Sequence, residues 1–154
     1  MVLTRRKFIE LMMLSSGGLF FSSVSGGSSN SSDQSQWFMP EESELHERTW
    51  MAFIASYDIW EKGQVPELHR NLASIARTIA KYEPVNMLVR KQDVEIAIDL
   101  LGDLDTHNYP IELIEFDMND LWMRDTGPTF VINENGQKAA VNFNFNGWGE
   151  DQDY

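Results

Sequence analysis

The fold is decided by residues 49–89, whose sequence is TWMAFIASYDIWEKGQVPELHRNLASIARTIAKYEPVNMLV. Its first segment, Thr49–Ile54, is apolar and rich in β-branched and aromatic residues, which predicts a buried strand. The middle segment, Val65–Lys81, has Pro66 in its first turn and is predicted to be a helix. The last segment, Val85–Val89, is a second apolar run and a second predicted strand. This alternation of strand and helix is typical of an α/β domain.

The predicted helix has one apolar face, which we expect to pack against a sheet. Its apolar residues recur at steps of four, three and four, the spacing that brings side chains to one side of a helix. The residues of this expected face are Leu68, Leu72, Ile75 and Ile79.

The alternation continues toward the C-terminus. Asp93 is predicted to cap a second helix. The apolar residues of that helix are Val94, Ile96, Ala97, Ile98, Leu100 and Leu101. Ile111–Phe116 alternates in polarity and predicts a third strand. Two further β-rich runs, Thr129–Ile132 and Ala139–Asn144, flank Asn135-Gly136, and this dipeptide between strands predicts a hairpin.

The composition limits the classes of function. The chain has 154 residues, a length that suits one domain, and its net charge is −12. Nucleic-acid binding requires clusters of Lys and Arg, so an acidic chain argues against that partner. The charge is compatible with a cationic substrate, but charge alone favours an acidic surface that serves solubility only. No phosphate loop, nucleotide fingerprint or metal-ligand cluster occurs, so no cofactor and no metal are expected.

The absence of cysteine is a second limit. The 154 residues include none. Disulfides, thiolate metal sites and catalysis by a cysteine nucleophile are therefore excluded within this chain.

The N-terminus is predicted to be a targeting segment. Arg5-Arg6 precedes the apolar stretch Ile9–Val24, which polar residues interrupt. Residues 1–27 resemble a twin-arginine signal peptide, which predicts export to the periplasm or beyond the cell. The alternatives are a chance basic start and an uncleaved membrane anchor, although the apolar runs are shorter than the roughly 20 residues of a membrane-spanning helix. After signal removal, no stable membrane span is expected.

The targeting segment is followed by a linker and then by the folded part. Residues 28–36 are rich in Ser and polar residues, so they predict a flexible linker. Residues 37–154 are expected to form the folded domain.

Unusual residues concentrate in the loop Asn119–Pro128, whose sequence is NDLWMRDTGP. A carboxylate accepts two parallel hydrogen bonds from a guanidinium group, and an aromatic face beside it covers the attached alkyl chain. Asp125 and Trp122 provide this combination, and Arg124 is placed to pair with Asp120. Taken singly, Asp125 is also compatible with a loop cap and Trp122 with a core position. Because the loop follows a predicted strand, where α/β proteins place their sites, we predict that it holds a cationic, guanidinium-like substrate.

Three motifs make the chain resemble a known family. They are Met39-Pro40-Glu41-Glu42 with His46-Glu47-Arg48-Thr49-Trp50-Met51, the run Trp122–Phe130 after Asn119-Asp120, and Phe143-Asn144-Phe145-Asn146-Gly147-Trp148-Gly149. In order and spacing they are similar to the agmatine deiminase and bacterial-type peptidylarginine deiminase family. The resemblance covers about Trp37 to Gly149 and identifies residues 37–154 as the N-terminal part of a deiminase domain.

The resemblance implies a fold and a reaction. The implied fold is a pentein, an α/β propeller of five ββαβ-type units, of which this chain holds the first one to two. Family members hydrolyse a guanidinium carbon to a ureido group and release ammonia. A cysteine thiolate attacks that carbon, a histidine transfers protons, and two acidic residues clamp the nitrogens. By resemblance, Asp125 is the first clamping residue and so takes part in catalysis and substrate binding, while Trp122 lines the channel for the alkyl chain of the substrate.

Two hypotheses for the function remain. In the first, the chain is an incomplete portion of an enzyme that acts on agmatine, giving N-carbamoylputrescine, or on peptidylarginine, giving citrulline. None of His46, His69 and His107 lies in a matching context, so all three are predicted to be ordinary surface or structural residues, and the chain alone is predicted to be inactive. In the second, the chain is an exported, non-catalytic binding protein for guanidinium ligands. The partner is then a small guanidinium compound or an arginine-containing peptide, and no pattern specifies the oligomeric state.

Overall fold

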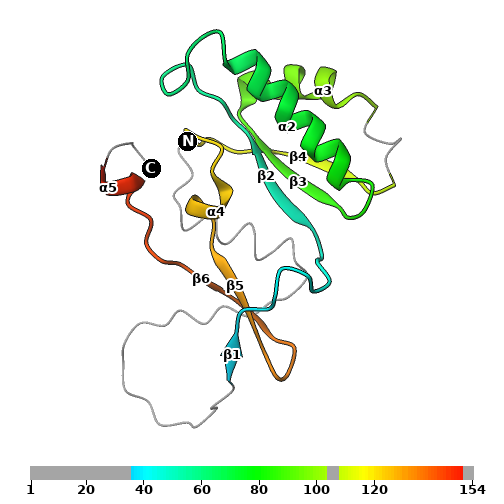
Figure 1. Ribbon diagram of the computed structural model, residues 1–154, viewed down its shortest axis with the longest axis vertical. Coiled ribbons are helices and arrows are strands. Elements are labelled where there is room, and N and C mark those ends of the chain that lie inside the picture. The colour runs from blue at the N-terminus through cyan, green and yellow to red at the C-terminus, as the bar shows by residue number, and fades with distance from the viewer. Residues whose placement is uncertain (1–35, 104–107, 151–154) are drawn as a thin grey trace. The chain divides into compact units, whose positions relative to one another are not determined.

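The computed structural model describes residues 36–103 and 108–150, which form two compact units (Figure 1). The first unit contains residues 45–103, 108–126 and 145–150, and the second contains residues 36–44 and 127–144. The predicted signal peptide at 1–27 and all of the predicted linker before Gln36 lie outside the described residues. Within the described ranges, no helix combines the length and the apolar character needed to cross a bilayer.

The first unit is built on a parallel three-stranded sheet with the order β2-β3-β4. The strands are β2 (Thr49–Phe53), β3 (Val85–Val89) and β4 (Ile111–Glu115). They pair in register, with Thr49 opposite Val85 and Val85 opposite Ile111. All three predicted strands are confirmed, and β3 has the predicted bounds. All five residues of β3 are buried, as expected for the central strand of a parallel sheet.

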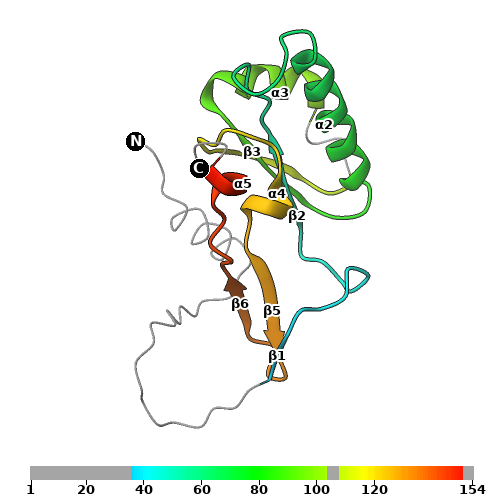
Figure 2. The same cartoon turned by 60° about the vertical axis from the view of Figure 1, so that its left-hand side comes forward.

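Two helices cover one face of this sheet (Figures 1 and 2). They are α2 (Val65–Ile79) and α3 (Val94–Leu101), so both predicted helices are confirmed. Connections between adjacent parallel strands are right-handed, and for this reason successive helices lie on the same side of the sheet. The core between the layers includes Phe53, Met87 and Leu101, which are almost completely buried. Burial of side chains of this size is the main stabilising contribution to such a layer, at roughly 1.5–3 kcal/mol each.

The predicted buried face of α2 is partly wrong. Leu72 is buried, but Ile75 is 49% exposed. The helix instead turns Ala73, Ala76 and Ala80 toward the sheet, and each of them is at most 1% exposed. Small side chains allow the helix backbone to approach the strands closely, so the dense packing of the interior is reached without large residues at these positions. Leu68 and Ile79 lie at the margins of the contact and are partly buried.

The predicted position of Asp93 at the N-cap is confirmed, but the predicted capping by its side chain is wrong. Asp93 is the N-cap residue of α3, but its side chain makes no capping hydrogen bond. Its carboxylate instead accepts a hydrogen bond from Arg90 Nε at 2.7 Å, across the short 3-10 turn η1 (Lys91–Asp93). A nearby guanidinium group is a stronger partner than a backbone N–H group, and both side chains are largely buried here. Arg90 also donates to the carbonyl oxygen of Ala55, which joins the loops after β2 and β3.

The second unit is an antiparallel sheet with the order β1-β5-β6. Its strands are β1 (Trp37–Phe38), β5 (Thr129–Asn133) and β6 (Lys138–Val141). The predicted hairpin is confirmed, and its turn contains Gly136 at a φ of 71°. Asn133 Oδ1 accepts the backbone N–H groups of Asn135 and Gln137, which closes the turn. The last strand ends at Val141, three residues before the predicted end, and β1 was not predicted as a strand.

The three histidines differ in their surroundings. His69 of α2 is 4% exposed, and its ring stacks on Phe53 with 4.4 Å between the ring centroids. Its position agrees with a structural residue rather than a surface one. His46 Nδ1 lies within hydrogen-bond distance of Glu83 Oε2, at 3.0 Å, and His107 lies outside the described residues. Burial is the main cause that lowers the pKa of His69 below 6.5, while Asp93 opposes and Arg90 reinforces the shift.

This lowered pKa predicts a pH-dependent stability. In the unfolded chain His69 takes up a proton as the pH falls below about 6.5, whereas in the fold it stays neutral until a lower pH. The free energy of unfolding therefore decreases as the pH falls through this window. We expect the variant His69→Phe, which keeps a ring on Phe53, to lose less stability than the wild type between about pH 7.5 and pH 5. Urea unfolding at both pH values measures this. His46→Gln is the control, and an equal pH dependence in His69→Phe and the wild type would contradict the prediction.

Candidate functional site

Two loops meet at the carboxyl edge of the parallel sheet. Because β2 and β4 are parallel, the loops that follow them start at the same edge. Trp60 lies in the loop after β2, and its indole Nε1 donates a hydrogen bond to Asp120 Oδ1 at 3.1 Å in the loop after β4. The ring of Trp60 also lies 6.5 Å from the ring of Trp122, at a tilt of 35°. The contacts join segments that are 60 residues apart in the sequence.

The carboxylate of Asp120 anchors this junction. It is 5% exposed, and Oδ1 accepts both the indole N–H of Trp60 and the backbone N–H of Leu121 at 2.8 Å. A buried carboxylate is costly unless its oxygens are hydrogen-bonded, so these donors account for its place in the interior. The indole partner was not predicted from the sequence. The predicted pair of Asp120 with Arg124 stays a prediction.

The predicted loop contains one turn of helix, α4 (Met123–Thr126). The carbonyl oxygen of Trp122 accepts the backbone N–H groups of Asp125 at 3.2 Å and Thr126 at 3.0 Å, and the Thr126 hydroxyl at 2.9 Å. Trp122 comes directly before this turn and Asp125 lies on it, so the backbone of the turn links the two residues. Trp122 is 45% exposed and Asp125 is exposed. Both predicted site residues are therefore exposed to solvent, and their role in a site stays a prediction.

A third segment reaches Asp125 from the C-terminal part of the first unit. It is α5 (Gly147–Glu150), a short helical segment with a kink. Trp148 of α5 donates its indole N–H to Asp125 Oδ1 at 3.3 Å, and its ring contacts Phe145 edge-on with 4.8 Å between the centroids. Sequence reasoning assigned no role to Trp60 or Trp148. Trp148 was part of a motif that carried the resemblance, whereas nothing in the local sequence singled out Trp60.

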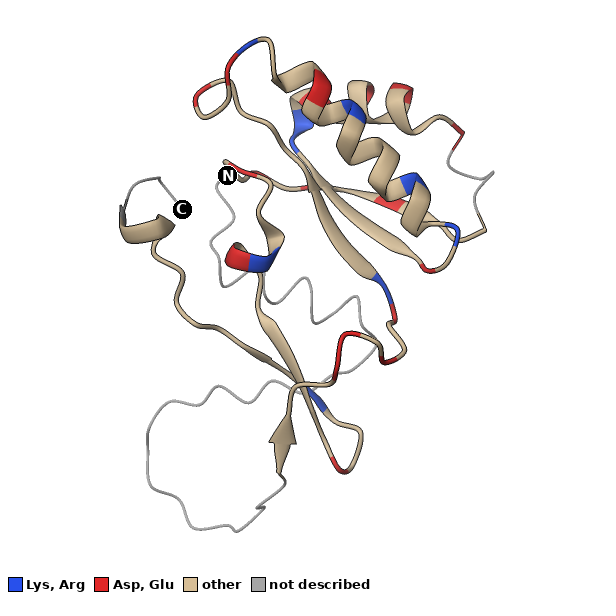
Figure 3. Cartoon of the chain, in the orientation of Figure 1, with Lys and Arg blue, Asp and Glu red and all other residues tan. Residues whose placement is uncertain are grey.

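These residues form a site that combines aromatic surface with carboxylates. Two indole N–H groups hold two carboxylates, and an indole carries no charge, so these hydrogen bonds leave the negative charge in place. Basic and acidic positions are interspersed along α2 and the loops near it (Figure 3). Within the described ranges, no group of three or more metal-binding side chains occurs. The arrangement is suited to a cation with an alkyl or planar body.

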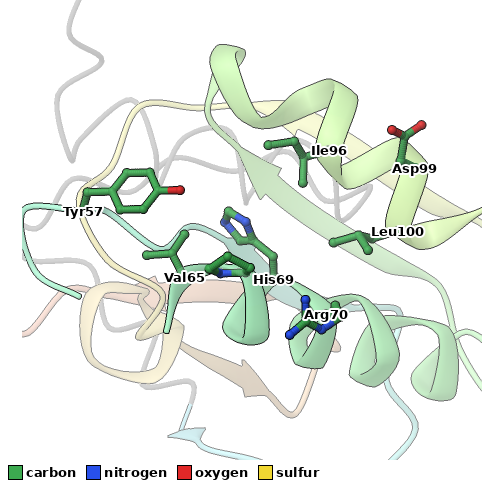
Figure 4. Close-up of a pocket in the computed structure, with 8 residues that line it drawn as sticks. Tyr57, Val65, His69, Arg70, Ile96, Asp99 and Leu100 are labelled. Carbon is green, nitrogen blue, oxygen red and sulfur yellow. The ribbon is translucent and has the colours of Figure 1, made fainter. Parts of the chain in front are cut away.

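A separate cavity of about 290 Å³ lies in the helical layer. Its lining residues are Tyr57, Val65, Pro66, His69, Arg70, Ile96, Asp99 and Leu100. Figure 4 shows the imidazole of His69 between Tyr57, from the loop after β2, and Ile96 of α3. The walls are mostly apolar, and the two charged residues, Arg70 and Asp99, are exposed. None of the residues 119–128 lines this cavity, so it is distinct from the site at the sheet edge.

Comparison with known families gives a match over most of the chain. Residues 38–154 match the model of the Porphyromonas-type peptidyl-arginine deiminase family. A putative agmatine deiminase of Legionella pneumophila is 40% identical over 116 residues, which is 75% of this chain and 32% of the relative. An agmatine deiminase of Pseudomonas aeruginosa is 39% identical over 111 residues, which is 72% of this chain and 28% of the relative. The chain thus spans about a third of the length of the curated relatives it matches.

Solved structures agree with this match. One neighbour is the agmatine deiminase of Enterococcus faecalis, described as catalysing its reaction. It is 31% identical with a TM-score of 0.58, and the match covers 68% of this chain and 27% of the neighbour's chain. A second neighbour is an agmatine deiminase of C. jejuni with substrate bound. Its TM-score is 0.64 at 17% identity, and the match covers 82% of this chain and 35% of the neighbour's chain. The second similarity concerns the fold alone. Both neighbours support a mixed α/β architecture of the pentein type.

The junction at Asp120 predicts a specific loss of stability. The variant Asp120→Ala leaves the N–H groups of Trp60 and Leu121 without their acceptor, which costs on the order of 1–3 kcal/mol. We expect a lower urea midpoint and a red shift of tryptophan fluorescence, since the loop that carries Trp60 is released. Asp117→Ala is the matched control, because Asp117 is an exposed carboxylate in the same loop. Equal midpoints for the two variants would show that the junction adds no stability.

Proposed function

This chain belongs to the Porphyromonas-type peptidyl-arginine deiminase family, and we propose that residues 37–154 form the N-terminal part of a domain that hydrolyses a guanidinium group. The substrate is agmatine, giving N-carbamoylputrescine, or peptidylarginine, giving citrulline. In either case water replaces one nitrogen of the guanidinium carbon and ammonia leaves. In this proposal the domain contributes the first one to two of five ββαβ-type units of a pentein.

The observation that carries the proposal is the placement of Asp125 and Trp122 at one turn, where the carbonyl oxygen of Trp122 accepts the backbone N–H of Asp125 at 3.2 Å. The exposed carboxylate of Asp125 binds two nitrogens of the guanidinium group, which orients the carbon for attack. The half-exposed ring of Trp122 covers the alkyl chain of the substrate. Trp60 extends this aromatic wall, because its ring lies close to that of Trp122. Asp125 is thus the catalytic and substrate-binding residue of this chain, and Trp122 is substrate-binding.

The reaction also needs a nucleophile that these 154 residues do not supply. A guanidinium carbon is a poor electrophile, and thiolate attack divides its hydrolysis into two easier steps. The chain contains no cysteine. We therefore propose that it binds the substrate and that turnover requires a thiolate from outside residues 1–154.

Calorimetric titration of the purified chain with agmatine tests the binding step. We expect agmatine to bind and putrescine, which has an amine in place of the guanidinium group, to bind more weakly. The variant Asp125→Asn should weaken agmatine binding by about tenfold or more, because it removes the charge and one acceptor of a bidentate pair. Asp117→Asn is the control with the same chemical change in the preceding loop. Equal affinity of Asp125→Asn and wild type would refute the clamp, and ammonia release by the chain alone would refute the need for an outside thiolate.

We further propose that the protein is exported, as a twin-arginine signal in residues 1–27 would require. The support is the arginine pair Arg5-Arg6 before a weakly apolar stretch. A reporter fused behind residues 1–36 should reach the bacterial periplasm, and the double variant Arg5→Lys, Arg6→Lys should keep it in the cytoplasm. Export of the double variant at the wild-type level would contradict a twin-arginine signal.

A further inference from the structure

Trp148 adopts a backbone conformation that bulky residues rarely take. Its φ is 55° and its ψ is 43°, in the left-handed region. Its neighbours Gly147 and Gly149 also have positive φ, at 65° and 89°. A Cβ atom at Gly149 would meet nothing within 4 Å, so glycine is needed there for its backbone angle and not for space. A strained backbone conformation of this kind persists only where the surrounding structure holds the residue in place. Such conformations are most common at functional sites.

Three contacts in and around this turn hold Trp148 in this conformation. Asn146 Oδ1 accepts the backbone N–H of Gly149 at 3.0 Å, which closes the turn around Trp148. Phe145 meets the indole ring edge-on, with an angle of 86° between the planes. The third contact is the hydrogen bond from the indole N–H to Asp125 Oδ1 at 3.3 Å. The turn therefore aims one N–H group at one carboxylate oxygen.

The hydrogen bond between Trp148 and Asp125 leaves the carboxylate able to bind a cation. An indole N–H only donates and an ionised carboxylate only accepts, so Trp148 and a cation both bind Asp125 through its acceptor positions. The indole is neutral and leaves the charge of Asp125 available, whereas a Lys or Arg in its place would cancel that charge. A carboxylate has about four acceptor positions, of which this bond uses one. The remaining positions suffice for the two parallel hydrogen bonds of a guanidinium group.

We propose that Trp148 is the positioning residue of the guanidinium site, and that its indole N–H fixes the rotamer of the Asp125 carboxylate. The inference rests on the proposed function of Asp125 and extends it to a residue that contacts the carboxylate rather than the reacting carbon. An exposed Asp side chain otherwise loses rotamer freedom when it binds a ligand. Because the indole has already removed that freedom, the ligand binds to a carboxylate that is preorganised.

Nuclear magnetic resonance of the indole N–H groups tests the contact without any ligand. The chain has five tryptophans, and Trp→Phe variants assign their signals. In Asp125→Ala we expect the Trp148 signal to shift and its hydrogen exchange to accelerate. The signal of Trp37, a tryptophan of the second unit with 45% exposure, should stay in place. An unchanged Trp148 signal in Asp125→Ala would overturn the proposal.

Titration with agmatine then tests the consequence of the contact. Trp148→Phe keeps a ring beside Phe145 and deletes the donor, and we expect it to bind agmatine about three- to tenfold more weakly than wild type. Trp37→Phe is the matched control and should bind as the wild type does. Gly149→Ala keeps the indole but strains the turn at a φ of 89°, so it should weaken binding in the same direction. Unfolding midpoints of all variants separate this effect from a loss of folding.

The outcomes separate this inference from the proposed function. If agmatine binds the wild type and Trp148→Phe equally, while Asp125→Asn fails to bind, the clamp stands and the positioning role is wrong. If agmatine does not bind the wild type, the proposed function of this chain fails. In that case the shift of the Trp148 signal in Asp125→Ala still decides whether the indole fixes the carboxylate.

Discussion

The candidate site depends on the buried carboxylate of Asp120. It joins the loop after β2 to the loop after β4 by accepting the indole N–H of Trp60 and the backbone N–H of Leu121. β3 lies between these two strands, so no backbone pairing brings their loops together. A side-chain contact must do so, and a carboxylate can serve because one of its oxygens accepts two donors at once. The position of Trp122, and with it that of α4, follows from this junction.

The parallel sheet explains why the functional residues gather where they do. β2, β3 and β4 all end at one edge, and the residues that follow them are free of the sheet pairing that constrains the strands. The helices α2 and α3 cover one face and leave this edge open to loops. Exposed aromatic and acidic side chains there do not disturb the core, which is made by the strands and by the alanine-rich side of α2. The core of the unit and the proposed binding site thus lie in different parts of the same unit.

Much of the first unit was predictable because its signals are local. β3 is an apolar run after Pro84, and its bounds follow from composition alone. The buried side of α2 was not predictable, since alanines carry little hydrophobic signal and yet occupy the closest approach to the sheet. The pairing of Asp93 with Arg90 in place of a cap required knowledge of which groups are buried. For the site, spacing placed Trp122 and Asp125 on one loop. The role of Trp60 was not predictable from the sequence, because a contact between residues 60 positions apart leaves no pattern in a single sequence.

Neutral donors are the common feature of the two carboxylates at this edge. Trp60 donates to Asp120 and Trp148 donates to Asp125, and in both pairs the orientation of the carboxylate is fixed while its charge is kept. An ion pair would also fix the orientation, but it would remove the electrostatic reason for a cation to bind. The difference between the two sites is exposure. Asp120 is buried and serves the framework, whereas Asp125 is exposed and has acceptor capacity left for a ligand. The same chemical pair thus gives a structural contact where water is excluded and, in the proposed site, a binding contact where it is not.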